Sequence, residues 1–333
     1  MDTSDQGQRR VELVGMTQLQ LNQTRRIRMT RMGIPHTGRG ARRIAPLLAV
    51  AAVSLAVLGF AAPALALKPT GDFVNFGDCP LNNPAVNQCI FAQTSSGQFS
   101  IGSTEVPITK TITLQGGLIF IEEPRSETFV NAKDGNTLSK TPQNVPGGLL
   151  KIVAPLGWPE ILQVIFNEFI SKGITGVNAT TELVATPTLN RVNLLTGSGT
   201  ALTLPVRVHL ENSFLGPKCY VGSASKPVTV NLTTGTTSPP EPNLPIKGTP
   251  GEFEFKDEGA LTIIKKNSLV NNSFSAPTAE GCGEQILFGI FTGIVDSAVN
   301  SELGLPSASG HNTAILNGQL ENALGSAVKA SEK

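Results

Sequence analysis

The sequence predicts a β-rich α+β fold in which antiparallel, sandwich-like sheets pack against two amphipathic helices. The composition is the first observation, because 34 Gly and 23 Pro accompany only 15% charged residues, as in chains of short strands joined by tight turns. The second is a set of segments whose apolar residues alternate with period two. The third is a pair of segments with the helical period, near 158–172 and 283–303.

The strand prediction depends most on residues 202–211, where every second side chain is apolar from Leu202 to Leu210. Antiparallel strands with one wet face produce this alternation, whereas parallel strands are buried on both faces. Pro205 cannot donate a backbone hydrogen bond, so this strand is expected at a sheet edge or with a bulge. Further strands are expected at 228–233, around Phe253 and Phe255, and more weakly at 108–115 and 182–186.

The two helix predictions come from apolar stripes with suitable ends. The segment 158–172 begins at Trp158 and Pro159, carries Ile161 on its apolar stripe, and is followed by Gly173. Trp158 is expected in the core. In the segment 283–303, Gly289 and Gly293 lie off the apolar stripe and are expected to let the helix approach a sheet closely. Both stripes are interpreted as ordinary core rather than pocket walls.

Residues 1–66 have the features of an export leader. Nine Arg precede an uncharged run from Ile44 to Ala62, and Ala64-Leu65-Ala66 follows. A basic region, an apolar segment and small residues in this order are typical of a signal peptide. Cleavage is predicted after Ala66, and an uncleaved membrane anchor is the alternative. Translation from Met32 would give a leader of ordinary length.

The mature protein is therefore expected to be residues 67–333, a secreted β-rich domain with a subdivision near 174–178 as the alternative. It carries 17 basic and 22 acidic side chains, a net charge of −5, which argues against nucleic-acid partners. The close basic pair Lys265-Lys266 is interpreted as an exposed strand end. The proline-rich segment 236–250 is either a linker between domains or a stiff surface loop. No transmembrane span is expected after signal cleavage.

All four cysteines lie in this mature part, as expected in an oxidising compartment. Four cysteines permit three pairings. The pairs Cys79–Cys89 and Cys219–Cys282 are predicted, the first because a Pro- and Asn-rich loop between its members folds back easily. A zinc site is the disfavoured alternative, since no C-x-x-C occurs and only two His remain. No metal or other cofactor is predicted.

Candidates for catalysis are few. His209, flanked by Arg207 and Glu211 on the polar side of 202–211, is a weak candidate general base, and a solvated sheet face explains it equally well. His311 is expected on a mobile surface loop, and Tyr220 near a rim. No G-x-S-x-G motif is present. The sequence therefore favours a protein that is not an enzyme.

Several segments of the mature part resemble those of uncharacterised secreted proteins of actinobacteria. They are Gly77-Asp78-Cys79-Pro80, Cys89-Ile90, Val106 to Thr111, Leu114-Gln115-Gly116-Gly117 and Lys218 to Ser223. The resemblance implies export from an actinobacterial cell, and it assigns neither an activity nor site residues.

Three hypotheses for function remain open. The first is a secreted or cell-wall-associated, non-catalytic structural or binding protein whose partner is a component of the cell envelope. The alternative is a carrier of a lipid or other apolar small molecule, held in a cavity between the sheet and the two helices. The third is a hydrolase of unfamiliar type that uses His209.

Overall fold

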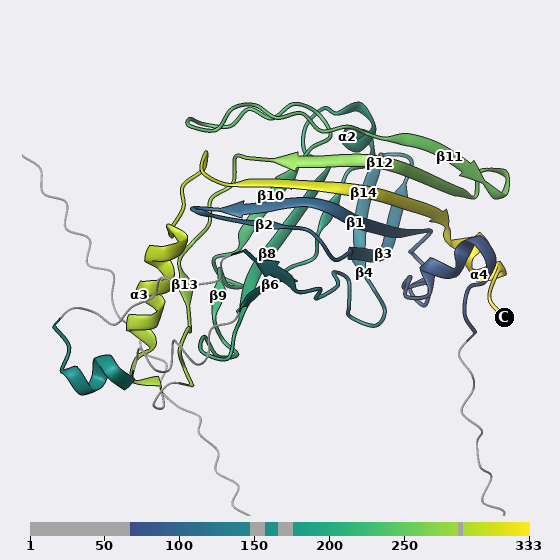
Figure 1. Ribbon diagram of the computed structural model, residues 1–333. Coiled ribbons are helices and arrows are strands. Elements are labelled where there is room, and N and C mark those ends of the chain that lie inside the picture. Colours follow the sequence, from purple (N-terminus) through teal and green to yellow (C-terminus); the bar gives the residue numbers. More distant parts are fainter. Residues whose placement is uncertain (1–66, 147–156, 166–175, 286–288) are drawn as a thin grey trace, which may run out of the picture. The chain divides into compact units, whose positions relative to one another are not determined.

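The structure is a computed structural model that describes residues 67–146, 157–165, 176–285 and 289–333. These residues form two seven-stranded antiparallel sheets, which confirms the predicted β-rich, sandwich-like fold (Figure 1). The described residues belong to one compact unit. The predicted leader and its cleavage site at Ala64 and Ala66 lie outside the described residues.

The first sheet is built around β1 and β14, two long strands that pair along most of their length. In spatial order its strands are β11 (Glu252–Lys256), β12 (Leu261–Asn271), β14 (Thr313–Leu324), β1 (Gln88–Ile101), β3 (Ile112–Ile121) and β4 (Ser126–Asn131), with β2 (Thr104–Pro107) also paired to β1. The sheet thus joins the first and last strands of the described chain.

The second sheet is built around β8. In spatial order its strands are β13 (Ala279–Glu280), β9 (Tyr220–Val221), β8 (Leu202–Glu211), β6 (Val177–Leu183) and β5 (Gln143–Val145), with β10 (Val228–Leu232) and β7 (Thr188–Leu189) also paired to β8. The two sheets are joined at one side, where Thr233 and Val270 exchange two backbone hydrogen bonds of 2.9 and 2.8 Å.

The remaining elements are short helices. They are η1 (Gly71–Phe76), α2 (Arg191–Thr196), η2 (Asp257–Gly259), α3 (Thr292–Leu303), α4 (Gly325–Ala330) and a helical stretch at 160–165. Helices η1 and α4 pack on the outer face of the first sheet, where Phe73, Phe76 and Val328 join a small core around the Cys79–Cys89 disulfide. The larger core lies between the two sheets.

Strand β8 spans the predicted residues 202–211, and its even-numbered side chains from Leu202 to Leu210 are all buried. The expectation that Pro205 marks an edge strand is wrong, because β8 lies between β9 and β6 in the sheet. Proline fits there because the pairing of β6 ends opposite Val206 and that of β7 begins opposite Thr203. The missing N–H of Pro205 therefore falls in the gap between two partner strands.

Other strand boundaries differ from the prediction. The expected strand at 108–115 is interrupted, since β2 ends at Pro107 and β3 begins at Ile112. Only the first two residues of the expected strand at 182–186 are in a strand, since β6 spans Val177–Leu183. Lys265-Lys266 is not a strand end but a bulge inside β12, where the register against β14 shifts between Ile264 and Asn267.

The expected burial of one face of β11 is also wrong. Phe253 and Phe255 are 46% and 66% exposed, and their rings stack on each other at 6.5 Å. Because β11 is the edge strand of the first sheet, its apolar face extends beyond the region where the sheets pack.

The helix predictions are met in part. Residues 160–165 are helical, but 166–172 lie outside the described residues, and Ile161 is 65% exposed rather than in the core. Trp158 packs against the main core, with its ring 5.4 Å from that of Phe291. In the second segment the helix α3 begins only at Thr292.

The expected role of the two glycines in the second segment is wrong. Gly289 precedes α3 with a φ of +82°, so it belongs to a turn. Gly293 is exposed and has open space where a Cβ would lie. Neither residue brings the helix closer to a sheet.

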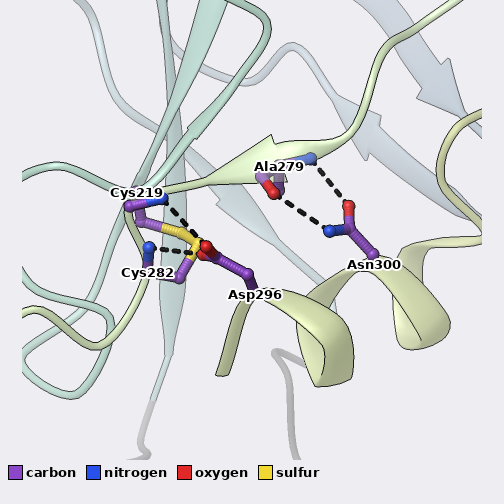
Figure 2. Close-up of a disulfide and its surroundings, with 6 residues drawn as sticks. Cys219, Ala279, Cys282, Asp296 and Asn300 are labelled. Carbon is purple, nitrogen blue, oxygen red and sulfur yellow. Dashed lines mark hydrogen bonds between the residues drawn. A yellow bond between two sulfur atoms is a disulfide. The ribbon is translucent and has the colours of Figure 1, made fainter. Parts of the chain in front are cut away.

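Both predicted disulfides are present, Cys79–Cys89 and Cys219–Cys282. The second is held by α3, as Figure 2 shows, because Asp296 accepts hydrogen bonds from the backbone N–H of Cys282 at 2.7 Å and of Gly281 at 3.3 Å. One turn further, Asn300 bonds both the N–H and the carbonyl of Ala279. Helix α3 therefore satisfies backbone groups of β13 through Asn300 and of the two residues that follow β13 through Asp296.

Burial raises the pKa of Asp296 above its ordinary value, more strongly than the backbone hydrogen bonds from Cys282 and Gly281 lower it, and the nearby Glu280 adds to the increase. The carboxyl group that holds the disulfide loop is thus easier to protonate than a free aspartate.

The proline-rich segment 236–250 is fastened to the body of the domain. Thr237 and Ile246 pair across it, and Asn243 donates to the carbonyls of Asn272 at 2.9 Å and Asn312 at 3.0 Å. These bonds favour the surface-loop interpretation over a linker.

Among the described residues, no helix combines the length and the apolar character needed to cross a bilayer.

Candidate functional site

An apolar cavity of about 130 Å³ lies between the two sheets. Its walls are the inner faces of β8 and β6 on one side and of β1, β12 and β14 on the other. Of the 32 described residues that line it, 25 are apolar and none is charged. For scale, an engineered cavity of about 150 Å³ with similar walls binds benzene. The space therefore suits one compact hydrocarbon group.

The cavity exists because small side chains occupy central positions of both inner faces. The small residues that border it are Ala179 and Thr181 of β6 and Ala92 and Thr94 of β1. Elsewhere on the inner faces, larger residues such as Leu204 and Leu320 fill the core. Protein interiors are close-packed, and voids larger than a water molecule are few. A space of this size is therefore a specific feature of this core.

The cavity lies between the sheets, not between a sheet and the two helices as the carrier hypothesis expected. Of the described residues of α3, Leu303 alone contributes to its wall. Residues 157–165 of the first helical segment do not border the cavity, and residues 166–172 and 286–288 of the two segments lie outside the described residues.

The three glutamine side chains at the cavity wall already have partners. Gln143 accepts from the N–H groups of Thr109 and Lys110 and donates to the carbonyl of Lys110. Gln319 donates to Gln93 at 3.2 Å and to Glu321 at 3.1 Å. These amides are structural, because their hydrogen-bonding capacity is used within the protein.

Asn267 of β12 is the exception among the buried amides. It is 4% exposed and borders the cavity, and no hydrogen bond joins its side chain to any residue in the part of the chain that the structure describes. Sequence reasoning missed Asn267, because the bulge at Lys265-Lys266 reverses the alternation of β12. The signal was present in the pattern Ile263-Ile264-Lys265-Lys266-Asn267, which fits no regular strand.

The predicted catalytic candidates His209 and Glu211 lie elsewhere, on the outer face of the second sheet. The Nδ1 atom of His209 is 3.3 Å from a carboxylate oxygen of Glu211. The imidazole stacks on Tyr220 at 4.4 Å, and the Arg207 guanidinium lies 4.0 Å from the centre of the same phenol ring. Nε2 of His209 is buried and has no hydrogen-bond partner among the described residues.

Glu182 completes this cluster. It accepts from Arg207 at 2.7 and 3.0 Å and lies 3.5 Å from Lys140. Burial alone would raise the pKa of Glu182, but the hydrogen bonds and positive charges of Arg207 and Lys140 outweigh it and hold that pKa below its ordinary value. The cluster is a ladder of paired side chains across β6, β8 and β9, as solvated sheet faces have.

The other residues discussed as site candidates are separate from both features. His311 is exposed, and its backbone N–H bonds the carbonyl of Ala308 at 3.3 Å. Within the described ranges, no three His, Cys, Asp or Glu side chains converge as metal ligands would.

Searches against protein-family models, curated proteins and solved structures found no match to this chain.

Proposed function

We propose that this chain is an exported, non-catalytic binding protein that holds an apolar small molecule between its two sheets. The observation that carries the proposal is the uncharged, largely aliphatic cavity of about 130 Å³. Burial of apolar surface provides the affinity, since each methylene removed from water contributes about 0.8 kcal/mol. The volume suits a ring of about six carbons or the end of a longer chain.

The proposed location is outside the cytosol, secreted or associated with the cell envelope of an actinobacterium. The Arg-rich leader with Ala64-Leu65-Ala66 supports export. The two disulfides support it independently, because such bonds persist mainly in oxidising compartments. A carrier in this location would shield an apolar molecule from water outside the membrane.

The cavity is favoured over the His209 cluster as the functional site for a physical reason. Tyr220 covers one face of the imidazole and Glu211 lies at Nδ1. The unpaired Nε2 is buried, so a substrate could reach it only if surrounding side chains moved. Binding in the cavity displaces none, because the space is already there.

Binding to an envelope component is the second candidate function. It is supported by Phe253 and Phe255, which present a stacked aromatic pair on the edge strand β11. Exposed apolar groups on a sheet edge are suited to contact with another macromolecule or a membrane surface.

Native mass spectrometry of the protein recovered from its own host tests the carrier proposal. The full chain is produced with its leader, purified without detergent, and measured before and after extraction with organic solvent. The proposal expects an added mass that disappears on extraction and is identified in the extract. A homogeneous protein without added mass, which also binds no hydrocarbon probe afterwards, would contradict it.

A further inference from the structure

Asn267 is the one buried amide at the cavity wall whose hydrogen-bonding groups are unused by the described part of the protein. Its residue exposure is 4%, and it lies on the inner face of β12 with Leu269. The amide atoms of Asn267 are not among the fully enclosed, unpaired side-chain atoms of the described residues, so they keep contact with open space. A buried polar group normally has a partner, and at this wall a ligand can supply it.

The backbone around Asn267 is shaped to point this amide inward. The register of β12 against β14 shifts between Ile264 and Asn267, and Lys266 has a φ of +54°, in the left-handed region. Bulges re-aim side chains and occur beside functional sites, and a non-glycine residue at positive φ is strained. If the alternation continued unbroken from the inward Ile264, Lys266 and Ser268 would face the core and Asn267 would point to the outer face.

A second bulge lies at the same level on the other side of β14. Asn267 and Thr94 are the register partners of the same residue, Gly318, and β1 shifts register immediately after Thr94. At Gly318 a Cβ would overlap the carbonyl oxygen of Gln93, so the three strands are closely packed there. Asn267 and Thr94 therefore lie on either side of Gly318, as two polar side chains in a mostly apolar wall.

The other unused polar groups at the wall are the hydroxyls of Thr94, Thr104 and Thr181, which likewise bond no described side chain or backbone group. The described lining has no charged residue, so it offers no counter-ion for a carboxylate, phosphate or ammonium group. Burying an unpaired charge is far more costly than burying a hydroxyl or carbonyl. The lining thus selects against ligands whose buried part is charged.

We infer that the ligand is a compact apolar molecule with one uncharged hydrogen-bonding group, a hydroxyl or carbonyl, which pairs with the amide of Asn267. This inference rests on the proposed function, because it specifies the ligand class of the same cavity. The amide both donates and accepts, so it can pair with either kind of group.

The test compares two probes of similar size, cyclohexanol and methylcyclohexane, by NMR titration of the full-length product. In the Asn267→Leu variant, cyclohexanol is expected to bind about tenfold more weakly, the factor for one hydrogen bond to a buried group. Methylcyclohexane is expected to bind as tightly as before or more tightly. Asn317→Leu is the matched control, since Asn317 adjoins Gly318 in sequence but does not border the cavity, and it should change neither affinity.

The outcomes separate the two proposals. If the unmodified protein binds neither probe, both the carrier proposal and this inference are overturned. If it binds both probes and Asn267→Leu changes both affinities equally, the role of Asn267 is overturned while the carrier proposal stands. Should Asn267→Leu fail to fold, Asn267→Ala removes the amide without added bulk and is expected to give the same selective loss for cyclohexanol.

Discussion

A larger side chain at position 179, which would fill part of the cavity, tests whether the cavity is a ligand site or ordinary core. Ala179 lies on the inner face of β6, is 8% exposed and borders the cavity. Ala179→Ile adds three carbon atoms and keeps a side chain that suits a strand. The change should stabilise the ligand-free protein and weaken binding of an apolar probe, two effects that a normally packed core position cannot combine.

The magnitude follows from the cavity volume. Empty volume in a core costs about 24 cal/mol per Å³, so a cavity of about 130 Å³ destabilises the ligand-free protein by about 3 kcal/mol. If the added carbons fill about half of it, the free energy of unfolding should rise by about 1.5 kcal/mol. The affinity for methylcyclohexane should fall at least about tenfold, because the probe and the isoleucine compete for one space.

The assay is urea unfolding followed by circular dichroism, together with titration of methylcyclohexane. Ala314→Ile is the matched control, since Ala314 is fully buried in the same core but does not border the cavity. Overpacking there should cost about 1–3 kcal/mol. The reasoning is refuted if Ala179→Ile loses stability as the control does, or if it binds the probe as tightly as the unmodified protein.

Three further predictions concern the frame around the cavity. Replacing Cys219 and Cys282 by Ala should lower the free energy of unfolding by about 4 kcal/mol, because this disulfide closes a loop of 63 residues. Replacing Cys79 and Cys89 by Ala should lower it by somewhat under 3 kcal/mol, because the loop has only 10 residues. Urea unfolding that shows the reverse order would contradict the chain-entropy reasoning. The pH dependence of stability should change in opposite directions in two variants. The raised pKa of Asp296 means that the unmodified protein loses stability as pH rises from 3.8 through that pKa, a loss that Asp296→Asn should abolish. The lowered pKa of Glu182 means that this group contributes to the free energy of unfolding above pH 4.5, and that the contribution is lost as pH falls through the lowered pKa. Glu182→Gln should remove this pH dependence. If unfolding curves between pH 3 and 7 show the same pH dependence in either variant as in the unmodified protein, the corresponding assignment is refuted. Gly318→Ala should destabilise the protein by about 1–3 kcal/mol, because its Cβ overlaps the Gln93 carbonyl oxygen, and a melting temperature equal to that of the unmodified protein would show that the strands are less closely packed than described.

The sequence predicted the parts of the fold whose cause is local. The alternation of Leu202 to Leu210 defines β8 because one face of that strand is buried along its whole length. The pairing of Cys79 with Cys89 follows from a loop that folds back, and the remaining two cysteines then pair. These patterns need no knowledge of distant residues.

The errors come from features that depend on neighbouring strands. Pro205 is tolerated inside a sheet only because β6 ends and β7 begins opposite it. Phe253 and Phe255 alternate as buried residues do, yet no packed layer covers the edge strand on which they lie. Periodicity reports which side chains share a face, but not whether another element covers that face.

The candidate site could not be predicted from local patterns at all. Its walls bring Ala92 together with residues far away in the sequence, such as Asn267 and Leu320. Whether small residues at such positions leave a space depends on how two sheets pack, which no single segment encodes. His209 drew attention because histidine is chemically distinctive, whereas the cavity is made of ordinary aliphatic residues.

A crystal structure of the protein purified from its host without delipidation, compared with a crystal soaked in cyclohexanol, tests the central claim most directly. The account predicts electron density for a compact molecule between the two sheets, with a polar atom within hydrogen-bond distance of the Asn267 amide. Side chains that close the space in both crystals, with no bound molecule between the sheets, would contradict it.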